Sequence, residues 1–447
     1  MTAPRELPGG QLARSLRLPH ATALVAGTII GASVFVQASE ITALVPRIPV
    51  ILLAWVVAGI LSLFGALVCA ELASAFPRAG GIYVFLRETY GPLAGFLWGW
   101  SMFWIMHSGI IAVMAFVFAR YAAYFGTFDE RGIRMIAVAA IIVISAINYL
   151  GVKRGSTVQT LFTVGKILAI VFVVSVGFIV GSHLPLHFQY SANPAAPPPS
   201  PVTAAGFLLA LIAGLFTFGG WHIVTYIAEE TVEPERTIPR ALMIGIGVVT
   251  ACYVALNLVY FYVLPLDTVA KSTRIAADVA VALIGNRGGV IVAGLVTFSA
   301  FGAMTGSILA APRVYFAMAR DGLLFQWINV VHPKYRTPHR AIVLQAVWAS
   351  ALVWTGTYRQ LFTRVIFIQW AFFALMAAGL FLLRRRPDYR PAYRIWGYPV
   401  VPALFIVASL AIVINRLRLE PLDSFVGVGL VLIGVPVYFA MTRARSR

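Results

Sequence analysis

Long apolar segments, separated by short polar ones, recur along the whole chain. Each is close to the roughly 20 residues that a helix needs to cross the hydrocarbon core of a bilayer. Twelve such segments are expected, at residues 20–45, 49–75, 90–121, 133–150, 158–181, 204–230, 240–264, 288–317, 339–358, 362–383, 398–415 and 424–442. The pattern therefore predicts an all-α polytopic membrane protein with twelve transmembrane helices.

The composition and the charge agree with this prediction. Of 447 residues, 60% are hydrophobic and 11% are charged, whereas about 25% of the residues of soluble domains are charged. The net charge is +18, and the Lys and Arg residues lie in short loops rather than on one helix face. We therefore expect these basic residues to set the orientation of the chain in the membrane and to attract anionic lipid, and we expect no nucleic-acid partner. If both termini are cytoplasmic, more of these basic residues lie in cytoplasmic segments than in outer loops. We therefore expect a multi-pass protein of the cell membrane with both termini in the cytoplasm.

The polar segments divide the chain into two sets of five helices and a final pair. The run Pro197-Pro198-Pro199 cannot form a helix interior, so it is expected in an extracellular connector. The expected organisation is an N-terminal cytoplasmic segment 1–19, a first five-helix repeat 20–182, the connector 183–203, a second five-helix repeat 204–383, two helices with a preceding basic loop 384–442, and a cytoplasmic tail 443–447.

The first and sixth apolar segments are interrupted by glycine. Gly27 and Gly31 lie in the first, and the pair Gly219-Gly220 lies in the sixth, where glycine disfavours a continuous helix. The two segments occupy the same place in successive sets of five, and matching breaks of this kind indicate a transporter's binding site. Close helix packing through small residues is the alternative interpretation.

The broken backbone predicts which ligand groups bind there. N–H groups around Gly31, Ala32 and Ser33 would bind an anion, and freed carbonyls near Thr28 and near 216–219 would bind a cation. An α-amino acid carries both charges close together. We therefore predict substrate-binding residues Thr28, Gly31, Ala32, Ser33, Phe218 and Gly219, and expect a hydroxyl from Tyr253.

Lys166 lies within the apolar segment 158–181. A charge at membrane depth is expensive and is by default a functional candidate. Snorkelling of the ammonium to the interface is the alternative, although several apolar residues flank Lys166 on both sides. We predict a role in coupling.

Other polar residues at the ends or inside of spans have less specific interpretations. Glu71 is expected to pair with a cytoplasmic-side arginine such as Arg78, and Glu229 and Glu230 to belong to an inner gate or loop network. His222 is either a proton-coupling group or a hydrogen-bonded structural one.

No segment favours an enzyme. The spans contain no HExxH, GxSxG, CxxC or GxxxxGK[ST] pattern, so neither a catalytic residue nor a cofactor or metal is expected. The two cysteines, Cys69 and Cys252, lie inside apolar segments and predict no disulfide framework.

Four segments of the chain resemble those of the amino acid–polyamine–organocation transporters. They are GTIIGASVF at 27–35, FPRAGGIY at 76–83, FTFGGW at 216–221 followed by AEETVEPERTIP at 228–239, and YFAMARDGLL at 315–324. The order holds over residues 20–440, and Gly220-Trp221 resembles the L-type branch, which mostly handles neutral amino acids, often by exchange.

The resemblance implies a leucine-transporter-type fold with a five-plus-five inverted repeat and discontinuous helices 1 and 6. It also implies alternating access around a site between helices 1, 3, 6, 8 and 10. By the same resemblance, Phe216 closes over the substrate, and Lys166 takes the place of sodium between helix 5, the broken first helix and helix 8. Ser299 is the helix 8 hydroxyl expected nearby.

Two features depart from the family pattern. Ser33 stands where the first-helix signature usually has glycine, so the pocket for the carboxylate is expected to be narrower or to gain a hydroxyl donor. Residues 121–134 contain no cysteine, so no disulfide-linked heavy subunit is expected. A monomer or weak homodimer is predicted.

The predicted function is sodium-independent secondary transport of amino acids, by exchange or with a proton. Neutral substrates are favoured, because spans 1, 3, 6, 8 and 10 show no mid-membrane carboxylate to pair with a cationic side chain. A basic amino acid or polyamine permease and a non-transporting amino acid receptor remain alternatives.

Overall fold

The computed structural model describes residues 12–31, 33–123, 126, 128–182, 188–191, 193, 199–272, 274–356 and 358–443. In this part of the chain, nine helices or joined helical stretches are long and apolar enough to cross a membrane. The prediction of an all-α polytopic membrane protein is confirmed, and the count of twelve spans stays a prediction. The predicted connector lies mostly outside the described residues, as do residues 1–11 and 444–447.

The helices follow the apolar segments in order. The first half contains α1 (Leu18–Ile29), α2 (Val34–Leu44), α3 (Ile48–Ala75), α4 (Ile82–Tyr90), α5 (Pro92–Ser101), the π-helical η1 (Met102–Met106), α6 (His107–Ala122), α7 (Glu130–Tyr149) and α8 (Val152–Gly181). The second half contains α9 (Ala204–Thr217), the 3₁₀-helical η3 (Trp221–Glu230), α10 (Pro234–Val263), α11 (Leu266–Lys271), α12 (Ile275–Ile284), η4 (Gly285–Arg287), α13 (Gly288–Ala310), α14 (Pro312–Arg320), η5 (Gln326–Ile328), α15 (His339–Thr355) and α16 (Tyr358–Leu383). The chain ends with α17 (Val400–Leu419), α18 (Pro421–Leu432) and α19 (Gly434–Arg443).

Local sequence explains several helix starts. The Asp129 side chain accepts a hydrogen bond from the Gly132 N–H at the start of α7, and Thr203 caps α9 in the same way. Pro234 begins α10, where its fixed φ and missing N–H suit the first turn. Therefore α10 begins at Pro234 rather than at the predicted 240, because apolar character marks only the part of a helix that lies in the hydrocarbon.

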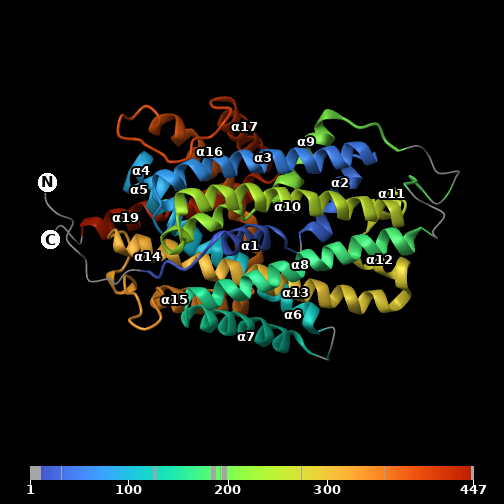
Figure 1. Cartoon of the computed structure of the whole chain (residues 1–447), viewed down its shortest axis with the longest axis horizontal. Helices are drawn as coiled ribbons and strands as arrows, with labels where there is room; N and C mark the ends of the chain where they lie inside the picture. The colour runs from blue at the N-terminus through green and yellow to red at the C-terminus, as the bar shows by residue number, and fades with distance from the viewer. Residues whose placement is uncertain are drawn as a thin grey trace.

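Corresponding helices of the two halves pack against each other. α3 lies along α10, α6 along α13 and α7 along α15, while α2 contacts α9 (Figure 1). In each pair, the two helices hold the same position in their sets of five, one in the first set and one in the second. Two related five-helix units would produce this arrangement.

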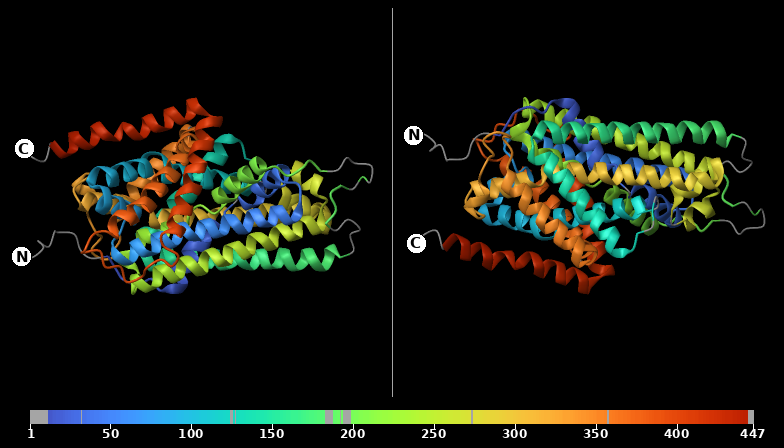
Figure 2. Two further views of the ribbon diagram at one scale, coloured as in Figure 1. Left: turned by 90° about the horizontal axis from the view of Figure 1, so that it is seen from above. Right: turned by 90° about the horizontal axis from the view of Figure 1, so that it is seen from below.

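The two ends of the bundle differ. α11, α12 and residues 188–191 lie at one end, here called the α12 end, and α4, α14 and the end of α19 lie at the other, the α14 end (Figure 1). At the α14 end, Leu16 forms an isolated parallel β-bridge with Thr231. α18 and α19 run along the edge of the bundle and finish at this same end (Figure 2).

Candidate substrate-binding site at two helix breaks

The first predicted break is present between α1 and α2. α1 ends at Ile29, Ile30 adopts an extended conformation with ψ of 92°, and α2 begins at Val34. Ala32 lies outside the described residues. A break removes the hydrogen-bond partners that backbone groups have within a continuous helix, so carbonyls near the end of α1 need other donors.

Lys166 supplies such donors from α8. Its Nζ atom donates to the Gly27 carbonyl at 3.0 Å and to the Ile30 carbonyl at 2.7 Å. The side chain is 3% exposed, so the ammonium is compensated by carbonyl dipoles rather than by water. The structure thus places Lys166 against the broken helix, and its role in coupling stays a prediction.

Gly27 allows α1 to approach α8 closely enough for this contact. A Cβ atom at Gly27 would lie 2.0 Å from Thr163 Oγ1 and 2.4 Å from Gln159 Nε2, both on α8. Thr163 Oγ1 also donates to the Ala23 carbonyl at 2.9 Å. A side chain at Gly27 would therefore separate the helices that Lys166 connects.

The second predicted break touches the first. α9 ends at Thr217, and Gly220 has a φ of 114°, a left-handed conformation that favours glycine. A Cβ at Gly220 would lie 3.0 Å from the Thr28 carbonyl. Thr28 Oγ1 donates to the Leu24 carbonyl at 2.7 Å and lies 3.2 Å from the Gly220 carbonyl.

Tyr253 on α10 connects the two breaks. Its hydroxyl donates to the Ile29 carbonyl at 3.0 Å and lies 3.5 Å from the Thr217 carbonyl, so it reaches the last residues of both α1 and α9. Phe218 is fully buried, with its ring 5.1 Å from that of Tyr253 and 6.4 Å from that of Trp55. Both side chains hold the breaks in place, and direct contact with substrate stays a prediction for them.

The remaining predicted residues lie beside the two breaks. A Cβ at Gly31 would have no neighbour closer than Met114 at 3.8 Å, and one at Gly219 would meet only the Phe216 carbonyl at 3.2 Å. Phe216 is 36% exposed, and Ser33 is half-buried.

Ser299 lies near Lys166 without a recorded hydrogen bond to it. Both residues line one cavity, and Ser299 is 4% exposed. Within the described part of the chain its Oγ atom has no hydrogen-bond partner. The predicted proximity is present in the structure, whereas a contact between the hydroxyl and the ammonium is not.

A polar pair beyond the second break was not predicted from the sequence. His222 Nε2 lies 3.3 Å from Gln369 Nε2 on α16, and the His107 ring lies 6.3 Å from the His222 ring. All three side chains are buried. Gln369 could have been noticed because it is a polar residue within an apolar segment. No feature of the neighbouring sequence, however, indicates that it meets His222.

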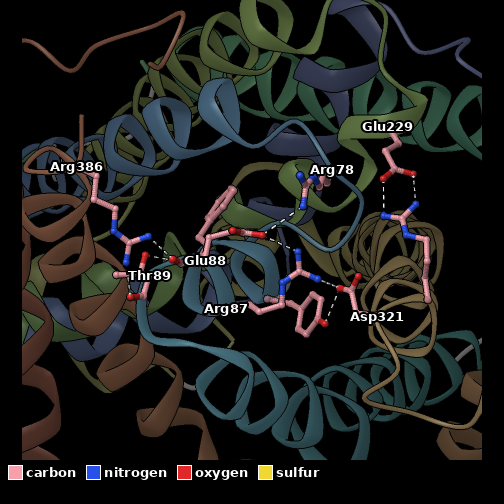
Figure 3. Close-up of polar contacts among 10 residues, drawn as sticks. Arg78, Arg87, Glu88, Thr89, Glu229, Asp321 and Arg386 are labelled. Atoms are coloured by element: carbon pink, nitrogen blue, oxygen red, sulfur yellow. Dashed lines mark hydrogen bonds and ion pairs between the residues drawn. The ribbon is translucent and has the colours of Figure 1, made fainter. Parts of the chain in front are cut away.

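Ion pairs close the α14 end beneath the breaks. Glu230 accepts from Arg313 Nε at 2.8 Å and Nη2 at 3.0 Å, with both side chains fully buried. Glu229 forms a similar two-point pair with Arg320 at 2.6 and 2.9 Å (Figure 3). Both arginines belong to α14, so this helix is fastened to the end of η3.

α4 extends the same network. Arg87 pairs with Asp321, just after α14, and with Glu88 at 2.6 Å, while Arg386 donates to the Glu88 and Thr89 carbonyls (Figure 3). Ahead of α4, the Gly80 N–H donates to the Tyr226 carbonyl of η3 at 3.2 Å. These contacts join α4, η3 and α14 at this end.

Glu71 pairs with an arginine, as predicted, but the partner is Arg384 rather than the suggested Arg78. Glu71 is fully buried and accepts from Arg384 at 2.8 and 2.5 Å and from the Ile395 N–H at 2.7 Å. Arg78 instead lies 3.3 Å from Glu88. The basic loop after α16 folds over the end of α3, and proximity in sequence could not indicate this.

Comparison with known proteins identifies the family. A family model described as amino acid permease matches residues 16–439. The serine/threonine exchanger SteT of Bacillus subtilis is 31% identical over 97% of this chain and 98% of its own length. The human large neutral amino acids transporter small subunit 2 is 30% identical, over 96% of this chain and 81% of its own.

A further relative carries a different substrate. The human cystine/glutamate transporter is 29% identical over 96% of this chain and 85% of its own length.

Among the described residues, no group of three or more His, Cys, Asp or Glu side chains is arranged to hold a metal ion. The chain belongs to the amino acid permease family and is a membrane transporter, not an enzyme.

Proposed function

We propose that this chain is a sodium-independent transporter of neutral amino acids that works by exchange. The observation that carries the proposal is the contact of the Lys166 ammonium with the carbonyls of Gly27 and Ile30 at the first break. The relatives named as a serine/threonine exchanger and a large neutral amino acid transporter support it.

Lys166 removes the need for a bound sodium ion. Freed carbonyls at a helix break attract a cation, and here the tethered ammonium takes two of them. The cation therefore belongs to the protein and is not transported. A proton-linked carrier, in which Lys166 changes its protonation during the cycle, is the alternative mechanism.

The buried charges favour a neutral substrate. Among the described side chains, four of the Asp, Glu, Lys and Arg residues are buried: Glu71, Lys166, Glu230 and Arg313. Each already has partners, as given above. A basic amino acid or polyamine would need a free buried carboxylate, so that class fits less well than a neutral amino acid.

The backbone at the breaks would hold the part common to all amino acids. We infer that N–H groups around Gly31, Ala32 and Ser33 bind the carboxylate, while carbonyls near Thr28 and Gly219 bind the ammonium. Phe216, partly exposed beside the second break, would cover the bound substrate. The hydroxyl of Ser33 would narrow the carboxylate site and favour small substrates.

The ion pairs at the α14 end support alternating access. They close this end, which we assign to the cytoplasm because both ends of the described chain and the basic loop lie there. Inward opening would separate Glu229 and Glu230 on η3 from their arginines on α14. We place the protein in the cell membrane.

We propose that the transporter works without a disulfide-linked heavy subunit, as a monomer or weak homodimer. Cys69 is fully buried and Cys252 is 9% exposed. Neither thiol is placed to bond to another chain, and these are the chain's two cysteines.

Transport in liposomes tests the proposal. Purified protein would be reconstituted in sodium-free buffer, with uptake of labelled serine, leucine, arginine and putrescine measured with and without unlabelled substrate inside. Uptake of a neutral amino acid that requires internal substrate is expected. Lys166→Ala should lose most of this uptake, whereas Lys153→Ala, an exposed lysine on the same helix, should not.

Other outcomes would contradict particular parts. Uptake of only arginine or putrescine would contradict the neutral-substrate assignment. A requirement for sodium would contradict the role of Lys166. An absence of all uptake by folded protein would favour the receptor alternative.

A further inference from the structure

A cavity of about 310 Å³ lies between α8, α10, α12 and α13. Nearly all of its walls are apolar side chains. Phe172, Ile284 and Ile291 belong to these walls and are 61%, 42% and 44% exposed. Apolar side chains exposed on a membrane protein face the acyl chains, so the cavity is accessible from the bilayer.

Polar groups are few in this cavity, and three of them are hydrogen-bond donors without enough acceptors. Ser299 and Tyr260 line it, are 4% and 1% exposed, and have no hydroxyl partner in the described part of the chain. Lys166 also lines it, and an ammonium has three N–H donors, of which two are recorded on carbonyls.

A buried hydroxyl without a partner is unfavourable, because it has lost the hydrogen bonds that water gives it in the unfolded chain. The Ser299 hydroxyl near a buried ammonium, in one otherwise apolar cavity that also contains the Tyr260 hydroxyl, indicates a ligand with an acceptor group and an apolar body. The cationic charge of Lys166 favours an anionic acceptor, because a buried carboxylate is tolerated when it is paired and hydrogen-bonded.

We propose that this cavity binds a lipophilic monocarboxylic acid taken up from the bilayer. The carboxylate accepts hydrogen bonds from Lys166 and Ser299, and the unbranched chain lies along the apolar walls towards Phe172 and Ile291. The acid enters from the bilayer as its carboxylate, which pairs with the Lys166 ammonium without any proton transfer.

Occupancy of the cavity would also act on the first helix break. The Ile30 carbonyl is bonded to Lys166, and Ile30 itself lines the cavity. A carboxylate on the same ammonium weakens that hydrogen bond and slows exchange. This second effect rests on the proposed transport function, whereas binding does not.

Photolabelling tests the binding without any transport assay. Purified protein would be irradiated with a dodecanoic acid that carries a diazirine at the end of its chain, and labelled peptides would be identified by mass spectrometry. We expect label on α8, α12 or α13, removed by unlabelled dodecanoate. The methyl ester of the probe should label about tenfold less, because it lacks the anionic acceptor.

Two variants on neighbouring residues of α8 provide a matched comparison. Ala169 lines the cavity, so Ala169→Phe should fill it and reduce labelling about tenfold, since overfilled sites exclude ligand. Leu168 is 62% exposed and is not part of the cavity, so Leu168→Phe should label normally. Ser299→Ala removes the hydroxyl near the ammonium and should lower labelling several-fold while keeping the fold.

Three results would overturn the proposal. The first is equal labelling by the methyl ester and by the acid. The second is label located away from these helices. The third is undiminished labelling of the Ala169→Phe variant, provided that it unfolds at the same temperature as the wild type and is therefore folded. If labelling occurs as expected but no amino acid is exchanged, the site stands and the proposed function fails.

Discussion

At the scale of single residues, the site depends on backbone groups that need partners. Lys166 and Tyr253 donate to three carbonyls at the end of α1, and Gly27 and Gly220 leave room where a Cβ would collide. None of these four residues is conspicuous in a soluble protein. In an apolar interior each decides whether a broken helix is stable, because water cannot replace a missing hydrogen bond.

Lys166→Met should therefore destabilise the protein as well as impair transport. The two carbonyls lose their recorded side-chain donor, at about 1–3 kcal/mol for each buried group left unsatisfied. Thermal unfolding in detergent would show a lowered Tm, with Lys153→Met unchanged. An unaltered Tm for Lys166→Met would mean that water or the backbone satisfies these carbonyls.

Gly220→Ala should abolish most transport. Alanine at a φ of 114° is strained by about 1–3 kcal/mol, and its Cβ would press on the Thr28 carbonyl. Gly247→Ala on α10 is the control, since open space surrounds that position and alanine favours a helix by about 1 kcal/mol. Equal loss of initial exchange rate in both variants would argue against a special role for Gly220.

At the scale of elements, the interrupted helices are held from the sides. α8 holds the end of α1 through Lys166 and Thr163. α10 holds the ends of both α1 and α9 through Tyr253. A broken helix can therefore keep a defined geometry, because two continuous helices provide the rigid support that the break removes.

Tyr253→Phe tests this support by removing one oxygen. The loss of a buried hydrogen bond should lower the free energy of unfolding by about 0.5–1.5 kcal/mol, and a looser break should raise KM for exchange. Tyr121→Phe, at an exposed position on α6, serves for comparison. Wild-type KM in Tyr253→Phe would show that the breaks hold their geometry without the hydroxyl.

At the scale of the whole molecule, the two ends of the bundle are unequal. The α14 end is fastened by the buried pair of Glu230 and Arg313 and by a charged network, part of which is drawn in Figure 3. The Gly80 N–H joins η3 to the start of α4 as well. A transporter that alternates must open this end. The pair of Glu230 and Arg313 is therefore a large local barrier, and its removal should change both stability and cycling.

A double-mutant cycle measures this pair. Glu230→Gln and Arg313→Met should each lower stability strongly, by about 3–5 kcal/mol, because each leaves a buried partner uncompensated. The double variant should lose less than the sum, since no unpaired charge remains. Additive losses in Tm would show that the two side chains do not depend on each other.

Much of the fold and part of the site could be predicted from local sequence. Apolar length decides membrane helices, and glycine disfavours them, so the segments around Gly31 and Gly220 were expected to break and do so. Lys166 stood out because a charge in an apolar segment needs an explanation. Such properties belong to a residue and its sequence neighbours, and folding does not alter them.

The partners of these residues were decided only by the tertiary structure. Glu71 was expected to pair with an arginine such as nearby Arg78, and the arginine that reaches it is Arg384, because the loop after α16 folds over α3. Gln369 meets His222, and Ser299 and Tyr260 join Lys166 in one cavity, across helices far apart in sequence. Hydrophobic length and helix propensity act along the chain, whereas a contact depends on how helices pack, and many packings suit the same apolar surfaces.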